Sequence, residues 1–136
     1  MAPFKIQHID HIVLRVEDLQ RSIDFYARVF GAELVKRQDQ LGLVHLRAGT
    51  SMIDLVDIQG EIGRQGGAAP GRERRNVDHF CLRIEPFDEA ALVSHLQSFG
   101  MDIEKAASRF GAEGSGLSIY CFDPDGNRVE LKGPSS

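Results

Sequence analysis

The feature of this 136-residue sequence that most constrains its fold is an internal repeat. Residues 9–17 read IDHIVLRVE and residues 77–85 read VDHFCLRIE, so five of nine positions are identical. The second histidine follows the first by half the length of the chain. Self-similarity at such a spacing is typical of a supersecondary unit that is present more than once. The sequence therefore predicts two copies of one unit.

Each copy continues with a segment of helical periodicity. Apolar residues recur at helical spacing in residues 19–30, and a similar stripe follows the second copy. Asp18 and Gly31 are residue types that begin and end helices, and Asp88 and Gly100 have the same places in the second half. We therefore expect one helix after each repeated strand.

The rest of each half is rich in short β-prone runs. They comprise residues 32–38, 41–48, 51–58, 101–106, 117–122 and 128–132. The last two flank DPDGN, in which Asp-Gly supplies the positive φ of a tight hairpin turn. The predicted fold class is α+β, with two tandem βαβββ modules at about 6–58 and 77–133. The loop 59–76 between them is rich in glycine, proline and charge.

Size and composition are those of an ordinary globular chain, and we expect residues 1–136 to form a single domain. The apolar fraction is 42%, the charged fraction is 26% and the net charge is −4. This balance does not favour nucleic acid or an acidic membrane surface as a partner. With two cysteines, no signal-peptide core and no apolar run approaching ~18 residues, we expect a reduced, cytoplasmic protein.

The repeat also brings four potential metal ligands into equivalent places. Aligning SMIDLV with NRVELK puts Asp54 at the repeat equivalent of Glu130. Each module then offers one histidine and one carboxylate: His11 and Asp54 in the first, His79 and Glu130 in the second. Two imidazoles with one or two carboxylates suit a divalent first-row metal such as Zn, Ni, Mn, Co or Fe.

Structural interpretations of these and other polar residues remain open. The two histidines and Glu130 are also compatible with ordinary strand positions, and Asp54 with a plain polar one. His45 faces either solvent or a pocket, and Cys81 either lines a pocket or is a small core residue. The basic run in the central loop reads either as a solvated segment or as an anion-binding lid; it comprises Arg72, Arg74 and Arg75.

Residues 9–34, 77–85 and 120–133 together resemble the vicinal-oxygen-chelate (VOC) superfamily of glyoxalase I, fosfomycin-modifying enzymes, extradiol dioxygenases and bleomycin-resistance proteins. The resemblance implies that the paired modules wrap into a cup-shaped half-barrel around a metal. The implied metal ligands are His11, His79 and Glu130. It also implies a homodimer with sites shared between chains.

The sequence departs from the glyoxalase I pattern at Asp54, where glyoxalase I has a glutamate. Aspartate is shorter by one methylene, or about 1.5 Å of bond length. Asp54 is therefore expected either as a ligand beside Glu130 or as a catalytic or substrate-contacting residue. Glu130 and Asp54 are the two candidate catalytic carboxylates.

The resemblance implies four functions, all with a small molecule as the partner. The first is a metal-dependent glyoxalase-like lyase or isomerase, in which a carboxylate moves a proton. The second is a fosfomycin-type thiol or water transferase, and the third is an Fe(II) extradiol dioxygenase. The fourth is a non-enzymatic binder of the bleomycin-resistance kind, for which the absence of tryptophan leaves few stacking surfaces.

Overall fold

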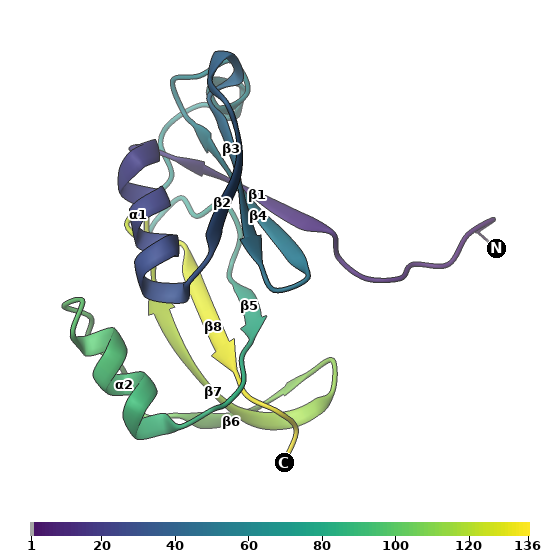
Figure 1. The fold of residues 1–136 in the computed structure, drawn as a ribbon, viewed down its shortest axis with the longest axis vertical. Helices are drawn as coiled ribbons and strands as arrows, with labels where there is room; N and C mark the ends of the chain where they lie inside the picture. The colour runs from purple at the N-terminus through teal and green to yellow at the C-terminus, as the bar shows by residue number, and fades with distance from the viewer. Residues whose placement is uncertain (1) are drawn as a thin grey trace. The chain divides into compact units, whose positions relative to one another are not determined.

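A computed structural model describes residues 2–136, and these divide into two compact units, one up to Ala69 and one from Pro70 to Ser136. Each unit contains one four-stranded sheet and one α-helix (Figure 1). The boundary between the units falls inside the loop 59–76. The α+β class and the two βαβββ modules are therefore confirmed.

The first unit has the sheet order β1-β4-β3-β2. Its elements are β1 (His11–Val16), α1 (Leu19–Phe30), β2 (Glu33–Gln38), the 3-10 turn η1 (Asp39–Leu41), β3 (Leu43–Ala48), β4 (Ser51–Asp57) and the 3-10 turn η2 (Gly63–Gly66). β1 runs parallel to β4, and the other neighbouring pairs are antiparallel. One face of the sheet is apolar and buried, as Leu14, Val44 and Leu55 show with no exposed surface.

α1 forms where the sequence predicts it, because both ends of the helix are capped. The Asp18 carboxylate accepts a hydrogen bond from the backbone N–H of Arg21 at 3.0 Å. Gly31 ends the helix with φ of 73°, a left-handed conformation that favours glycine. The helix lies against its own sheet (Figure 1), where Tyr26 is fully buried. Burial of one such large side chain contributes roughly 1.5–3 kcal/mol.

The second unit repeats this topology with the order β5-β8-β7-β6. Its elements are β5 (Phe80–Arg83), α2 (Glu89–Gln97), β6 (Ala107–Gly111), β7 (Gly114–Phe122) and β8 (Arg128–Lys132). β5 is parallel to β8, as β1 is to β4. Asp88 caps α2 by accepting from the backbone N–H of Ala91 at 3.2 Å.

The DPDGN hairpin between β7 and β8 is confirmed and is held by a polar network. The Asp123 carboxylate accepts hydrogen bonds from the backbone N–H groups of Asp125 and Asn127. The Asn127 side chain, which is fully buried, also donates to Asp123 at 2.7 Å and accepts from Asn76 at 3.0 Å. Gly126 takes the positive φ, 81°, that the turn requires.

Three sequence expectations need correction. The strand expected at 101–106 lies at Ala107–Gly111, because the antiparallel partner of β7 must directly precede the turn that ends at Gly114. The second helix ends at Gln97 with Ser98 as its C-cap, rather than running to the expected stop at Gly100. His79 lies one residue before β5 rather than inside a strand.

Within residues 2–136, the structure contains no helix with the length and apolar character needed to cross a lipid bilayer.

Candidate functional site

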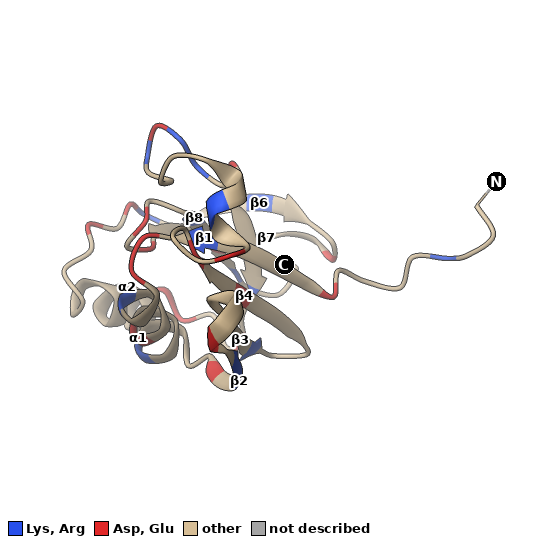
Figure 2. Ribbon diagram, turned by 90° about the horizontal axis from the view of Figure 1, so that it is seen from above, with Lys and Arg blue, Asp and Glu red and all other residues tan. Residues whose placement is uncertain are grey.

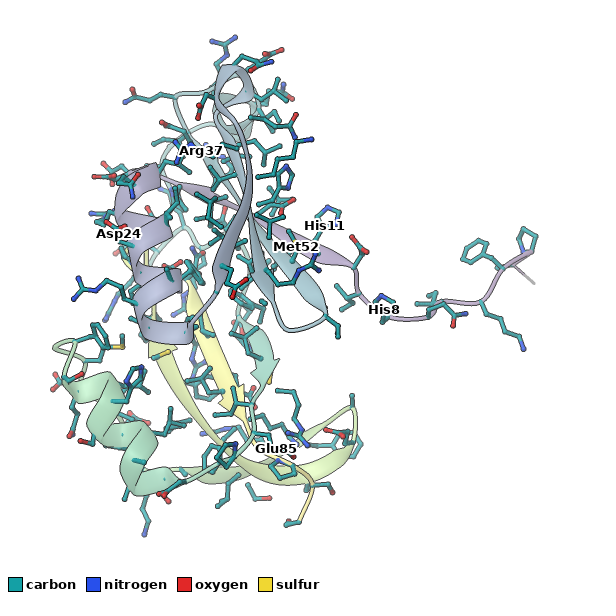
Figure 3. All side chains as sticks on the ribbon, viewed as in Figure 1. His8, His11, Asp24, Arg37, Met52 and Glu85 are labelled. Atoms are coloured by element: carbon teal, nitrogen blue, oxygen red, sulfur yellow. The ribbon has the colours of Figure 1, made fainter. Side chains whose placement is uncertain are left out.

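The first half of the candidate site lies on neighbouring strands β1 and β4. Because His11 pairs with Met52 across these parallel strands, Asp54 lies two residues further along on the same face. Figure 3 shows His11 and Met52 side by side at this end of the sheet. Nε2 of His11 is 4.0 Å from Oδ2 of Asp54, whose side chain is buried.

Asp10 orients the imidazole of His11. Its Oδ2 lies 2.8 Å from Nδ1 of His11, so the Nδ1 nitrogen is occupied and Nε2 points at Asp54. This hydrogen bond raises the pKa of His11 and lowers the pKa of Asp10. A carboxylate on one ring nitrogen is the usual partner of a histidine that binds a metal through the other nitrogen.

The second half repeats the arrangement with a glutamate. Nδ1 of His79 lies 2.7 Å from Oδ2 of Asp78, and Nε2 lies 3.3 Å from Oε1 of Glu130. Glu130 is 6% exposed and sits on β8 beside β5. The hydrogen bond to His79 lowers the pKa of Asp78. Each DH dipeptide of the sequence repeat therefore directs one Nε2 at one buried carboxylate.

Asp54 has a second imidazole neighbour, His45 of β3. Nδ1 of His45 lies 3.0 Å from Oδ1 of Asp54. The angle is not that of a hydrogen bond, and among residues 2–136 Oδ1 is a buried oxygen without a hydrogen-bond partner. The sequence left open whether His45 faces solvent or a pocket; in the structure His45 pairs with Asp54 across β3 and β4.

The donor types of both halves fit a divalent metal. Imidazole nitrogen with carboxylate oxygen is the mixed set that Zn and its neighbours accept. The unpartnered Oδ1 of Asp54 is an anionic atom in a buried place, where a cation would offset the cost of its burial. In the described part of the chain, no group of three or more His, Cys, Asp or Glu side chains is placed to hold a metal ion.

A cluster of cations surrounds Tyr120 in the second unit. The guanidinium carbon of Arg128 lies 3.6 Å from the centre of the Tyr120 ring, and that of Arg109 lies 4.4 Å from it. The same ring meets the edge of His79 at 5.5 Å. Lys132, on the same strand as Arg128, is 5% exposed. We call Arg109 and Arg128 the cationic cluster; basic residues are blue in Figure 2.

Sequence reasoning missed the cationic cluster because its members come from different strands. Alternation along β8 puts Arg128, Glu130 and Lys132 on one face, which was visible in the sequence. The approach of Arg109 depends on the shifted position of β6. Arg109 is held there by hydrogen bonds to the backbone oxygen and hydroxyl of Ser118 at 2.8 and 2.9 Å.

The basic run of the central loop is also engaged within the second unit. The guanidinium carbons of Arg72 and Arg75 lie 4.5 and 5.6 Å from the centre of the Phe122 ring. Arg75 further donates to the backbone oxygen of Asp78 at 3.3 Å. These two arginines therefore pack on Phe122, which lies two residues after Tyr120 on β7.

Cys81 is exposed and pairs with Glu130 across β5 and β8. Desolvation, with the nearby Glu130 charge, raises the pKa of its thiol to about 11. At neutral pH Cys81 is therefore a protonated and weakly nucleophilic thiol.

Comparison with known proteins agrees with this architecture. Residues 8–131 match the Glyoxalase/Bleomycin resistance protein/Dioxygenase superfamily. The chain is 33% identical to virulence protein STM3117 of Salmonella typhimurium, over 93% of this chain and 83% of that protein. The crystal structure of STM3117 superposes with a TM-score of 0.78, covering 96% of this chain and 99% of the other.

Two further relatives carry the names of enzymes. The lactoylglutathione lyase of Escherichia coli O157:H7 is 30% identical, over 89% of this chain and 88% of the lyase. The metallothiol transferase FosB of Bacillus licheniformis is 28% identical, over 93% of this chain and 75% of the transferase. With the family match spanning both repeated modules, the chain belongs to the glyoxalase/bleomycin resistance protein/dioxygenase superfamily.

Proposed function

We propose that this protein is a metal-dependent lyase or isomerase of the glyoxalase type that acts on a small substrate with two neighbouring oxygen atoms. One observation carries the proposal: in both modules an aspartate holds Nδ1 of a histidine while Nε2 faces a buried carboxylate. A carboxylate on one ring nitrogen, with the other nitrogen free to face a ligand, is the arrangement found at histidines that bind a metal.

In this proposal the metal ligands are His11, His79 and Glu130. They are supplied by both modules, either of one chain or of two chains in a homodimer. A bound divalent metal would act as a Lewis acid towards the substrate oxygens. The half-buried imidazoles and the buried Glu130 carboxylate supply its mixed nitrogen and oxygen donors.

The carboxylates of the chain would move the proton. Isomerisation of a 2-oxo hemithioacetal removes a proton from one carbon and returns it to the neighbouring carbon, and one carboxylate can perform both transfers. Glu130 is the first candidate, since its buried oxygen lies beside His79. Asp54 is the second, because its Oδ2 faces His11 and its Oδ1 has no hydrogen-bond partner among the described residues.

The decisive experiment measures metal in the purified protein. Elemental analysis of wild type, His79→Ala and the control His95→Ala is expected to find bound metal in the first and third only. His95 is an exposed residue of α2. Chelation should abolish, and a divalent metal restore, turnover of the hemithioacetal of methylglyoxal and glutathione. Equal metal in the His79→Ala protein would refute the proposal.

A second candidate is a fosfomycin-type thiol or water transferase, which the cationic cluster and the buried Lys132 favour. Lys132 is buried, and within residues 2–136 it makes no ion pair with a carboxylate, so an anionic substrate group would offset the cost of its burial. The similarity to FosB points the same way. Consumption of fosfomycin with cysteine or glutathione, and not of the hemithioacetal, would favour this candidate over the first.

A further inference from the structure

Lys132, at the end of β8, is a buried cation without a partner of opposite charge. The residue is 5% exposed, and within the described part of the chain it makes no ion pair with a carboxylate. Arg83 pairs with Lys132 across β5 and β8, and it is Arg83 that binds the carboxylates of Glu85 and Glu113. A lysine is seldom buried so deeply unless its charge is paired.

The first module shows that the fold does not require a charge at this place. Alignment of SMIDLV with NRVELK makes Val56 the repeat equivalent of Lys132. Val56 is 2% exposed and pairs with Leu43, so the position is buried and apolar in the first module. Lys132 pairs with Ser118 instead. Because burial of a charge costs free energy and burial of a valine does not, the fold alone does not account for Lys132.

Two glycines leave the space that the Lys132 side chain occupies. A Cβ atom at Gly111 would lie 3.0 Å from Cε of Lys132, and one at Gly116 would lie 3.2 Å from its Nζ. The end of the lysine therefore lies over the bare backbone of β6 and β7. Arg109 precedes Gly111 by two residues on β6, so its side chain emerges on the same face of the sheet.

The cationic cluster brings two more positive charges to this face. Arg109 donates to the backbone oxygen and the hydroxyl of Ser118, which is the register partner of Lys132. Arg128 shares a face of β8 with Lys132, and its repeat equivalent in the first module is the uncharged Met52. Among residues 2–136, neither arginine makes an ion pair with a carboxylate. Three cations thus gather on one face without an anion to balance them.

We propose that Lys132, together with Arg109 and Arg128, forms a subsite for an oxyanion of the substrate: a carboxylate, phosphonate or phosphate group. The inference rests on the proposed function, whose substrate class it narrows to small molecules with such a group. Glu130 lies between Arg128 and Lys132 on β8 and is directed at His79 at 3.3 Å. Two residues of a strand span about 7 Å, so one small molecule can reach both Glu130 and Lys132.

The first test measures the binding of inorganic phosphate to the metal-free protein by calorimetric titration. Wild type is expected to show one site. Lys132→Met keeps an apolar stem but removes the ammonium group, and it should weaken phosphate binding by about tenfold or more, as the loss of a charged hydrogen bond does. Lys105→Met, at an exposed lysine of the same unit, is the matched control. Absence of phosphate binding to wild type, or wild-type affinity in Lys132→Met, would overturn the inference.

Thermal unfolding of the same proteins separates an anion subsite from a structural lysine. Because Lys132→Met removes an unpaired buried charge, its Tm should equal or exceed that of wild type. Phosphate should raise the Tm of wild type and of Lys105→Met but not that of Lys132→Met. A lowered Tm for Lys132→Met, with no effect of phosphate on wild type, would assign Lys132 to the fold and refute the subsite.

Gly111→Ala is a second variant, which keeps the charge and moves it. Gly111 has no positive φ, so alanine is compatible with its backbone, but the added Cβ crowds Cε of Lys132. The displaced ammonium group should bind phosphate about tenfold or more weakly. If Lys132→Met fails to fold, this variant decides: wild-type affinity in Gly111→Ala would then reject the subsite.

The last test asks whether the anion belongs to the substrate. The hemithioacetal of methylglyoxal with 3-mercaptopropionate carries a carboxylate, and that with 2-mercaptoethanol does not. In the metal-loaded protein, kcat/KM should be about tenfold or more higher for the charged substrate, and Lys132→Met should remove the difference. Phosphate should compete with the charged substrate. Phosphate binding without such competition would indicate a site for a free anion and contradict the assignment to substrate.

The outcomes distinguish this inference from the proposed function. If wild type turns over neither hemithioacetal, the proposed function fails, and the phosphate titration alone decides whether Lys132 binds an oxyanion. If wild type turns over both equally well and Lys132→Met does the same, the inference fails and the proposed function stands.

Discussion

Oδ2 of Asp78 lies 2.7 Å from Nδ1 of His79, and this contact recurs in the other module between Asp10 and His11 at 2.8 Å. In each DH dipeptide, the aspartate thus orients the imidazole of the histidine that follows it. It selects Nε2 as the nitrogen that faces the carboxylate. The aspartate carboxylate fixes the orientation of the imidazole ring and makes its Nε2 a stronger ligand for a metal. Removal of this carboxylate should therefore weaken metal binding.

Asp78→Asn is therefore expected to lower the affinity for a divalent metal by about 10- to 100-fold. The amide is nearly isosteric but lacks the charge that holds Nδ1. Calorimetric titration with Zn²⁺ or Mn²⁺ measures the change. Asp102→Asn, at an exposed residue that follows α2, is the matched control and should bind as wild type does. Equal affinities for the two variants would contradict the prediction.

Arg128→Gln is expected to weaken the binding of an anionic substrate or of inorganic phosphate by about tenfold or more, since hydrogen bonds to charged groups contribute roughly 1.5–3 kcal/mol. The guanidinium carbon of Arg128 lies 3.6 Å from the centre of the Tyr120 ring in the cationic cluster. Competition by phosphate in the turnover assay gives the affinity. Arg37→Gln, an exposed arginine paired with Asp39, should change nothing. If the Arg128→Gln protein contains as much metal as wild type, its loss of affinity lies in anion binding and not in metal binding.

Arg15→Met should destabilise the segment that follows β4. Arg15 donates from Nε to the backbone oxygen of Gly63 at 2.7 Å and from its terminal nitrogens to those of Gly67 and Ala68. We expect a loss of roughly 1.5–3 kcal/mol in the free energy of unfolding, the value of charged hydrogen bonds. Denaturant unfolding measures it, and faster amide exchange at residues 63–68 would localise it.

The control for this variant is Arg37→Met. Its ion pair with Asp39 lies on the surface, where such pairs contribute roughly 0–1 kcal/mol. If both variants lost the same free energy of unfolding, the loss in Arg15→Met would come from the removal of a surface charge. It would not come from the three hydrogen bonds of Arg15 to backbone oxygens.

The two cysteines should differ in alkylation. Burial raises the pKa of Cys121 to about 12, and that of Cys81 is raised to about 11. A raised thiol pKa lowers the thiolate fraction at pH 8, to about one in a thousand for Cys81. Iodoacetamide should therefore label Cys81 slowly, and faster as the pH rises towards 11. Cys121, which is 2% exposed, should be labelled only in denaturant.

Peptide mass spectrometry after timed quenching distinguishes the two sites. Native labelling of Cys121 at a rate equal to that of Cys81 would show that the strand carrying it opens readily, contrary to its place in the buried face of β7.

Much of the fold was predictable because its determinants are local or periodic. The cap residues Asp18 and Asp88 act on backbone groups three positions away. The DPDGN turn closes on itself through Asp123. The strand at 101–106 was misplaced because its position depends on pairing with β7, which no short window of sequence contains.

Part of the candidate site was likewise predictable from the sequence, and part was not. Comparison of the two modules singled out His11, His79, Asp54 and Glu130, because equivalent residues of a repeat take equivalent places. The approach of His45 to Asp54 escaped this reasoning, since its repeat counterpart is Tyr120 and not a histidine. The cationic cluster escaped it too, because Arg109 and Arg128 meet over Tyr120 only through the register of three strands.

The sequence by itself determined the duplicated βαβββ architecture, the helix ends and the pairing of one histidine with one carboxylate in each half. These follow from periodicity, capping and repetition, which act over a few residues or between identical motifs. Tertiary structure alone decided which oxygen of Asp54 lies near His45 and which cations gather at Tyr120. Such contacts depend on strand register, where a slip of one residue turns every side chain to the other face of the sheet.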